Sequence, residues 1–424
     1  MIKRLNLSSE EIMKTRFILI IIPLLTLALA LAGGFTLLWR FFVFLMVILL
    51  LSYLWPRLTI RGIGSRVRKF SDYCQVGKHF EEEFTVFNHS KIPAPFIEVQ
   101  EDTDLPGYQN SVAFNLSSQS SYYWRTKVNC RRRGEYNIGA LDVKVTDPFG
   151  FFALHRHFGK HQRVIVYPEV VDLPLFQALP RQEPGISPRH WPVSEMGPNA
   201  SRVREYASGD SLRHIHWRTT AHTSKLMVKE FDPDRTNYSF KDIWIVLDMH
   251  QDFQMGEGDE TTEEYGIKIA ASLVKKYIDS GKRVGLLVSG DHSYVFQPDA
   301  GEQHLNDMLR ALALIKATGE VSVDTLLTTQ MGRFDSGSAV IVITSSDNQE
   351  IAAPLHQVVS RGIIGISILL DSFSFGGRTS AANAARSLIT NGINVFIVRR
   401  GVDIARALNS RLLSSRIQYI GDRI

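Results

Sequence analysis

The sequence predicts a membrane-anchored multidomain protein, with an N-terminal hairpin of two transmembrane helices, a β-sandwich of immunoglobulin-like type and a C-terminal doubly wound α/β domain. Three observations support this fold class. Two uncharged apolar runs lie close together near the N-terminus, short segments of alternating hydrophobicity follow them, and apolar runs then alternate with helical patterns. The length of 424 residues also exceeds what one ordinary core accommodates, so several folded units are expected.

The membrane anchor is expected in residues 1–57. Its apolar runs cover residues 17–32 and 41–55, each near the lower end of the roughly 17 to 25 residues that cross a bilayer. The second run follows the first at once, which favours an anchor over a cleaved signal peptide. Basic residues precede the first run and follow the second, leaving only Arg40 in the connecting turn. The positive-inside rule then predicts a multi-pass protein of the inner (cytoplasmic) cell membrane with cytoplasmic soluble domains.

Charge and cysteine content exclude some classes of protein. The net charge is +5, but the basic residues gather beside the apolar runs and in one central stretch, which fits lipid headgroups better than nucleic acid. The cationic run Arg131 to Arg133 precedes Gly134, so we expect a solvated turn there. The two cysteines, Cys74 and Cys130, lack the spacing of a zinc site and are expected to be reduced thiols.

Residues 58–170 carry the pattern of the β-sandwich. Apolar and polar residues alternate with a period of two in several short runs, and glycine- or proline-containing turns separate them. An antiparallel sandwich with one buried face per strand follows from this pattern. Nothing in it indicates catalysis, and Asp147 ahead of Pro148 is expected to cap a turn.

Residues 241–424 alternate buried strands with helices. Continuous apolar runs at 243–247, 284–288, 339–344, 363–370 and 395–398 predict parallel strands buried on both faces. Helical patterns lie between them around residues 264–281 and at 302–316, 349–361 and 380–390, and a last one is expected at 402–413. In a doubly wound sheet, ligands bind at the carboxyl ends of strands. The side chains expected there are Asp248, His250, Asp252, Thr344, Ser345, Ser346 and Asp347.

The connecting segment, residues 171–240, holds a dense motif of charged and aromatic side chains. Arginines near Asp210 and Glu205 suit paired contacts with carboxylates, so we expect a buried ion-pair and stacking network that joins this segment to the α/β sheet. The alternative is a docking site for an acidic or phosphorylated partner. His214 and His216 could bind a metal if the segment were a strand, but no third ligand follows at suitable spacing. The motif residues are Arg204, Glu205, Tyr206, Gly209, Asp210, Arg213, His216, Trp217 and Arg218.

This motif resembles the signature of the DUF58 family of bacterial proteins. The resemblance lies in residues 204–218 and 225–230, is supported by residues 133–136 and 147–152, and extends to the N-terminal hairpin. It implies a von Willebrand factor A-like C-terminal domain. It also implies a genomic association with MoxR-type AAA+ ATPases, often beside transglutaminase-like membrane proteins. It implies no established reaction.

The von Willebrand factor A resemblance suggests one place for a metal ion. The usual site carries D-x-S-x-S after the first strand, with a distant Thr and Asp that complete an oxygen shell for magnesium. Here the run is Asp248-Met249-His250-Gln251-Asp252, so both serines are replaced, and Asp347 after Thr344 fits only with a shifted register. We expect a degenerate site without a cofactor; magnesium bound by Asp248, Asp252, Thr344 and Asp347 is the alternative.

Three functions remain open from the sequence. The first is a non-catalytic scaffold or adaptor that presents the A-like domain to a MoxR-type ATPase or its client at the membrane. The second is an envelope-associated hydrolase, although the chain contains no G-x-S-x-G, H-E-x-x-H, Walker A or G-x-G-x-x-G motif at the expected places. The third is a metal-dependent ligand-binding A domain. The motif evidence favours the adaptor.

Overall fold

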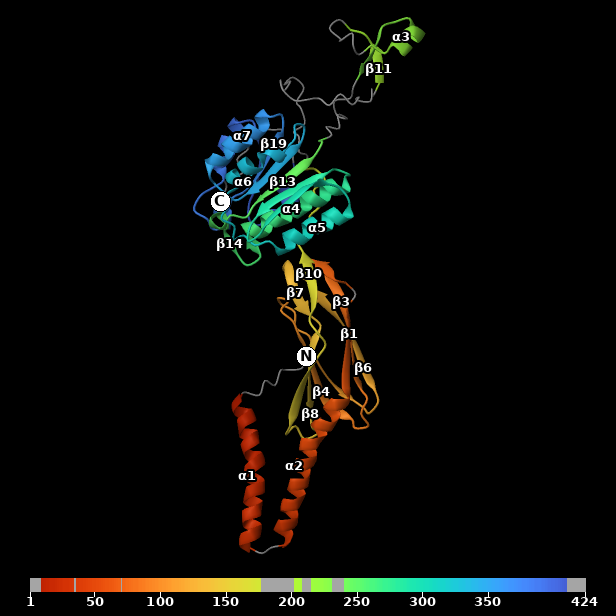
Figure 1. The fold of residues 1–424 in the computed structure, drawn as a ribbon, viewed down its shortest axis with the longest axis vertical. Coiled ribbons are helices and arrows are strands. Elements are labelled where there is room, and N and C mark those ends of the chain that lie inside the picture. The colour runs from red at the N-terminus through yellow and green to blue at the C-terminus, as the bar shows by residue number, and fades with distance from the viewer. Residues whose placement is uncertain are drawn as a thin grey trace. The chain divides into compact units, whose positions relative to one another are not determined.

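The chain divides into two compact units, Met1–Glu169 and Val170–Ile424. A computed structural model describes residues 9–33, 36–69, 71–176, 202–207, 215–230 and 240–409 (Figure 1). The division that we predicted into parts 1–57, 58–170, 171–240 and 241–424 is finer than these two units and stays a prediction.

The first unit begins with two helices, α1 (Ser9–Gly33) and α2 (Thr36–Gly62). Among the described residues, α2 is the one helix long and apolar enough to cross a membrane, and the apolar part of α1, Ile21–Gly33, is shorter. One apolar helix near the N-terminus is therefore established, and the second span stays a prediction. Arg40, which we placed in the connecting turn, lies within α2.

Helix α2 also extends beyond the predicted end of the anchor. It continues to Gly62 and passes directly into strand β1, which starts at Ile63. Pro56 lies inside the helix, and the hydroxyl of Thr59 donates to the carbonyl of Trp55 at 2.8 Å. Ser52, Pro56 and Thr59 are buried, so the last turns of α2 pack against the strands of the same unit.

After α2, the described residues of the first unit form ten strands in three sheets, with the orders β1-β3-β6, β5-β4-β8-β9 and β2-β10-β7. The first two sheets pair antiparallel throughout, and the third contains one parallel pair, β2 with β10. The strands are β1 (Ile63–Lys69), β2 (Tyr73–Gln75), β3 (His79–Asn88), β4 (Ala94–Asp102), β5 (Ser111–Leu116), β6 (Ser121–Asn129), β7 (Gly134–Ile138), β8 (Ala140–Thr146), β9 (Ala153–Phe158) and β10 (Gln162–Tyr167).

The alternating pattern of the strands produces the core of this unit. In β3, every second residue from Phe80 to Asn88 is buried. Phe84 and Val86 of β3 pack with Val99 of β4 and Val143 of β8, so the two antiparallel sheets share one hydrophobic core. A second cluster, under the third sheet, contains Cys74 and Cys130 as buried free thiols. A β-rich body is therefore established, and its immunoglobulin-like topology stays a prediction.

The second unit is built on a six-stranded sheet with the order β17-β16-β13-β18-β19-β20. All neighbours are parallel except β17, which pairs antiparallel with β16 at one edge. The strands are β13 (Ile243–Asp248), β16 (Val284–Ser289), β17 (Ser293–Asp299), β18 (Ala339–Thr344), β19 (Ile364–Leu370) and β20 (Asn394–Val398). The helices are α4 (Thr262–Asp279), α5 (Glu302–Leu314), α6 (Val323–Gln330), α7 (Ala352–Ser360), α8 (Ala382–Thr390) and α9 (Ile404–Ala407).

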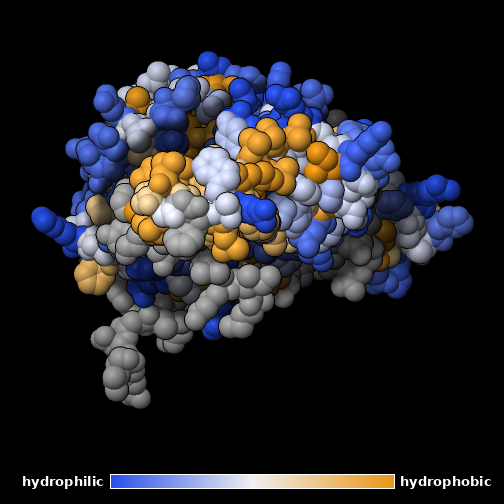
Figure 2. Space-filling model, turned by 90° about the horizontal axis from the view of Figure 1, so that it is seen from below, coloured by the Kyte–Doolittle hydropathy of each residue, from blue (hydrophilic) through white to orange (hydrophobic). Residues whose placement is uncertain are grey.

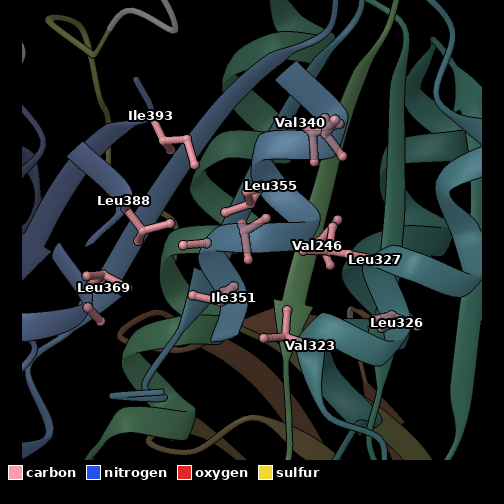
Figure 3. Close-up of a cluster of buried hydrophobic side chains, with 14 of the residues drawn as sticks. Val246, Val323, Leu326, Leu327, Val340, Ile351, Leu355, Leu369, Leu388 and Ile393 are labelled. Carbon is pink, nitrogen blue, oxygen red and sulfur yellow. The ribbon is translucent and has the colours of Figure 1, made fainter. Parts of the chain in front are cut away.

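Helices cover both faces of this sheet. On one face, Val246 of β13 packs with Leu327 of α6, Leu355 of α7 and Leu388 of α8 (Figure 3). On the other face, α4 approaches so closely that a Cβ on Gly266 would meet the Leu247 side chain at 3.2 Å. Because both faces are covered, every residue of β13, β16 and β18 is buried, as continuous apolar runs predict.

Several elements of the second unit differ from the prediction. Edge strand β17 and helix α6 were not predicted. The predicted helix 349–361 begins with a 3-10 turn, Gln349–Ile351, before α7. The described part of the predicted helix 402–413 contains only α9, and residues 410–424 lie outside the described residues.

Candidate functional site

The motif that carries the family resemblance folds in its described parts as a small module of two strands and one helix. Strand β11 (Arg202–Glu205) pairs antiparallel with β12 (Met227–Glu230), and α3 (Trp217–Thr223) lies between them in the sequence. Ile215 forms a bridge with Val228, and both side chains are buried. Gly209, Asp210, Arg213 and His214 lie outside the described residues, and the predicted contacts of Asp210 stay a prediction.

His216 determines how α3 begins. Its Nδ1 accepts the backbone N–H of Thr219 at 3.3 Å and lies 2.7 Å from the hydroxyl oxygen of that residue. The backbone N–H of His216 donates to the Met227 carbonyl at 2.8 Å, so the same residue caps the helix and joins it to β12. Because Nδ1 acts as a helix cap here, the structure assigns His216 a positioning role.

The other described motif residues of this module are exposed or half-buried. The Lys225 ammonium pairs with Glu205 at 2.6 Å, and this hydrogen bond raises the pKa of Lys225 although both side chains are exposed. Such exposed pairs stabilise proteins little. The Arg204 guanidinium donates to the carbonyl of Glu205 at 3.0 Å, Tyr206 is half-buried and Arg218 is exposed. Trp217, at the first position of α3, is 67% exposed.

The second candidate site lies at the carboxyl ends of β13 and β18. The chain passes from β13 through α4 to β16 on one side, and β18 lies on the other side of β13. This arrangement is a topological switch point, where open α/β sheets bind ligands. Asp248 ends β13 and Thr344 ends β18, and the Thr344 hydroxyl donates to Oδ2 of Asp248 at 2.6 Å. The structure thus brings together two of the four predicted metal-site residues.

Internal hydrogen bonds satisfy both oxygens of the buried Asp248 carboxylate. Oδ1 accepts the backbone N–H of His250 at 3.0 Å, and Oδ2 accepts the Thr344 hydroxyl. Burial raises the pKa of Asp248, and the hydrogen bonds from Thr344 and His250 oppose that rise. The Thr344 oxygen also accepts the N–H of Ser346 at 2.9 Å. The pair therefore stabilises the two strand ends.

The other predicted metal ligands are arranged differently. Asp252 is exposed, its N–H donates to Nδ1 of His250 at 3.3 Å, and its carboxylate lies 3.9 Å from the same nitrogen. Asp347 is half-buried in the loop after β18. In the described part of the chain, no three His, Cys, Asp or Glu side chains form a group that could hold a metal ion. Whether the site is degenerate stays a prediction.

Sequence reasoning missed part of this cluster. After β19, Asp371 is buried, accepts the N–H of Ala381 at 3.0 Å and lies 3.3 Å from the Arg399 guanidinium. The Ser372 hydroxyl donates to the carbonyl of Ser345 at 2.6 Å. The buried Ser345 hydroxyl has no hydrogen-bond partner among the described residues. A polar residue directly after a buried strand was the available signal, because the same signal identified Asp248.

A buried carboxyl pair in the first unit was also missed. Glu82 of β3 is fully buried, and neither of its oxygens has a hydrogen-bond partner among the described residues. Burial and then the negative charge of neighbouring Glu101 raise the pKa of Glu82 to about 8. Glu101 itself accepts hydrogen bonds from Tyr108, Asn110 and the N–H of Gly139. The burial of Glu82 could not be predicted, because a Glu at an inward position contradicts the alternation of apolar and polar residues in a strand.

These features define the class of protein: a β-rich unit carrying an apolar helix, joined to an α/β unit with a polar cluster at its switch point. Residues 202–368 match the family described as "Protein of unknown function DUF58". This match confirms the resemblance to the DUF58 family that the motif predicted.

One curated relative and several solved structures are similar to parts of the chain. An uncharacterized protein of Bacillus subtilis, YeaD, is 29% identical over 185 residues, which are 43% of each chain. The chain thus matches less than half of that relative. The CARDB domain of PF1109 from Pyrococcus furiosus covers 24% of this chain and 91% of its own at 17% identity and a TM-score of 0.19. Proximal thread matrix protein 1 from the mussel byssus covers 42% of this chain and 46% of its own, at 16% identity and a TM-score of 0.28. Neither likeness carries an argument about fold or function.

Proposed function

We propose that this protein is a non-catalytic scaffold or adaptor, anchored in the inner membrane by its N-terminal helices. In this proposal the two folded units lie on the cytoplasmic face, and the α/β unit is a von Willebrand factor A-like domain. Its partner is a MoxR-type AAA+ ATPase, or a client of that ATPase, as the DUF58 resemblance implies. A transglutaminase-like membrane protein is a further candidate partner.

The exposed Trp217 is the observation that carries this proposal. Trp217 has two thirds of its surface in water and occupies the first position of α3, directly after the His216 cap. Tryptophan is among the residues that contribute most to protein–protein binding, because it buries a large rigid surface on contact. Leu226, 46% exposed, adds apolar surface to the same module. The exposed apolar surface of this module therefore favours protein–protein binding over catalysis as its role.

The switch-point cluster supports a structural role for the strand ends. Each oxygen of Asp248 accepts one hydrogen bond from the protein, and these bonds hold the carboxylate between the ends of β13 and β18. The positive-inside pattern and the apolar helix α2 support the membrane location.

Co-purification with a matched pair of variants tests the proposal. The full-length protein is isolated in mild detergent with and without ATP and magnesium, beside Trp217→Ala and the control Phe373→Ala, which removes a 64% exposed aromatic from the same unit. We expect an AAA+ ATPase to co-purify with the wild type and the control in a nucleotide-dependent manner. Trp217→Ala should weaken that binding by about 2 kcal/mol, or roughly 30-fold.

Two outcomes would contradict the proposal. Equal recovery of the ATPase by Trp217→Ala and by Phe373→Ala would remove Trp217 from the docking surface. Recovery of no ATPase by the wild type would refute the MoxR-type partner and favour the envelope-associated hydrolase.

A further inference from the structure

The loop between β8 and β9 presents aromatic side chains on a tightly organised backbone. The Asp147 carboxylate is fully buried, and it accepts the N–H of Phe152 at 2.7 Å and the N–H of Phe149 at 3.0 Å. Gly150 closes the turn with a φ of +76°, and its N–H donates to the Asp147 carbonyl at 3.1 Å. The Phe149 side chain remains 58% exposed and stacks on Phe151 at a centroid distance of 5.8 Å.

The same carboxylate fixes this loop to helix α2. The Ser52 hydroxyl donates to Oδ2 of Asp147, and both side chains are buried. The Tyr53 ring meets the edge of Phe152 at a centroid distance of 5.7 Å. Nearby, the Trp55 indole N–H donates to the carbonyl of Pro93 at 3.1 Å, next to β4. These contacts fasten the loop to α2 at the position of Ser52 along the helix.

That position lies within the apolar part of α2. No charged residue occurs between Arg40 and Arg57, a rise of about 25 Å at 1.5 Å per residue. Ser52 precedes Arg57 by five residues, so the loop is fastened roughly 7 Å inside the charged end of this run. If α2 crosses a bilayer, its attached loop must enter the boundary between headgroups and acyl chains, since interfacial elements lie about 5 to 10 Å deep there.

The side chains around this level suit that boundary. Phe96 of β4 is 54% exposed. It pairs with Thr146, the last residue of β8 before the loop. The Arg57 guanidinium lies over the Tyr53 ring at 4.2 Å and is exposed, where it can meet lipid phosphates. Figure 2 shows a face of the molecule on which hydrophobic residues form orange patches among hydrophilic ones.

We propose that the loop of residues 147–152, together with Phe96, is a second membrane-binding element that inserts into the lipid headgroup layer beside α2. This inference rests on the proposed anchoring of the protein by its N-terminal helices. It assigns the ring of Phe149 to a lipid contact, and it assigns Asp147 the role of positioning that ring.

Photo-crosslinking in vesicles tests the proposal on the full-length protein. A photoreactive benzoylphenylalanine replaces, one at a time, Phe149 in the loop, Leu50 as the anchor reference and the exposed Phe373 as the control from the other unit. The protein is reconstituted in vesicles of phosphatidylethanolamine and phosphatidylglycerol, and lipid adducts are measured by mass spectrometry. We expect adducts at positions 149 and 50, severalfold above the level at position 373.

The failures of the two proposals are distinguishable. Adducts at position 50 with only the control level at position 149 would overturn the membrane-binding loop and leave the anchor intact. A protein–protein adduct in place of lipid at position 149 would overturn it in favour of a contact between two copies. Control levels at both positions would refute the anchor and the loop together.

Discussion

Buried carboxyl groups differ from one another in how far their oxygens are satisfied. Asp147 and Asp248 each accept hydrogen bonds on both oxygens, from a hydroxyl and from backbone N–H groups. Glu82 is equally buried but has a hydrogen-bond partner on neither oxygen among the described residues. Because an unpaired buried charge is costly, Glu82 is expected to keep its proton near neutral pH.

Glu82 should make the first unit less stable at alkaline pH. Its folded-state pKa of about 8 lies above the usual 4.5, so its protonated form stabilises the fold fully below about pH 4.5. That contribution is lost as the pH rises through about 8. Glu82→Gln should abolish this loss, and thermal unfolding from pH 5 to pH 9 measures it. The control Glu98→Gln, at a half-exposed residue paired with Lys144, should keep the wild-type pH dependence. An unchanged pH profile in Glu82→Gln would contradict the assignment.

Thr344 should stabilise the second unit through its hydroxyl. Thr344→Val keeps the shape of the side chain but leaves Oδ2 of the buried Asp248 without that donor, at a cost of about 1 to 3 kcal/mol. Thr344→Ser keeps the hydroxyl and should therefore reduce the free energy of unfolding clearly less than Thr344→Val does. Chemical unfolding of the three proteins gives the comparison, and equal losses in both variants would attribute the effect to packing alone.

At the scale of elements, the His216 cap of α3 can be tested without knowing the partner, because its loss should change the local stability of the helix. His216→Ala removes the acceptor for the Thr219 N–H and should destabilise this short helix by about 1 kcal/mol. His216→Asn restores a side-chain acceptor at the cap. We expect faster hydrogen exchange at Thr219 in the alanine variant only. Equal exchange in both variants would mean that the pairing of β11 with β12 holds α3 without the cap.

Elements with a strong periodic pattern were predicted from the sequence, and weakly patterned ones were not. The apolar runs ending at Asp248 and Thr344 identified β13 and β18, because strands buried on both faces are nearly continuous apolar runs. Edge strand β17 alternates exposed and half-buried residues, and Pro298 lies within it, so its sequence resembles a loop. Helix α2 continues past the predicted anchor because Ser52 and Thr59 are buried against strands, which no local pattern reveals.

At the scale of the whole molecule, the sequence predicted the alternation of elements but not their order in space. That Asp248 and Thr344 both end strands was readable, and their direct contact depends on β13 and β18 being neighbours. Which strands become neighbours depends on how the helices pack on both faces of the sheet. No local pattern reveals this for residues 243 and 339, because they are nearly a hundred positions apart. The bond between Ser52 and Asp147 could not be predicted for the same reason, because it joins residues 95 positions apart in the sequence.

The Ser52–Asp147 bond also implies an order of events during synthesis. Its two residues are separated by 95 positions, and helix α2 leaves the ribosome long before Asp147 is made. If α2 is a membrane span, as we propose, Ser52 enters the bilayer before Asp147 is made, and its hydroxyl can bond to the carbonyl of an earlier turn. The strands of the first unit then form beside a helix that has already left the ribosome, and the bond between Ser52 and Asp147 joins that helix to them.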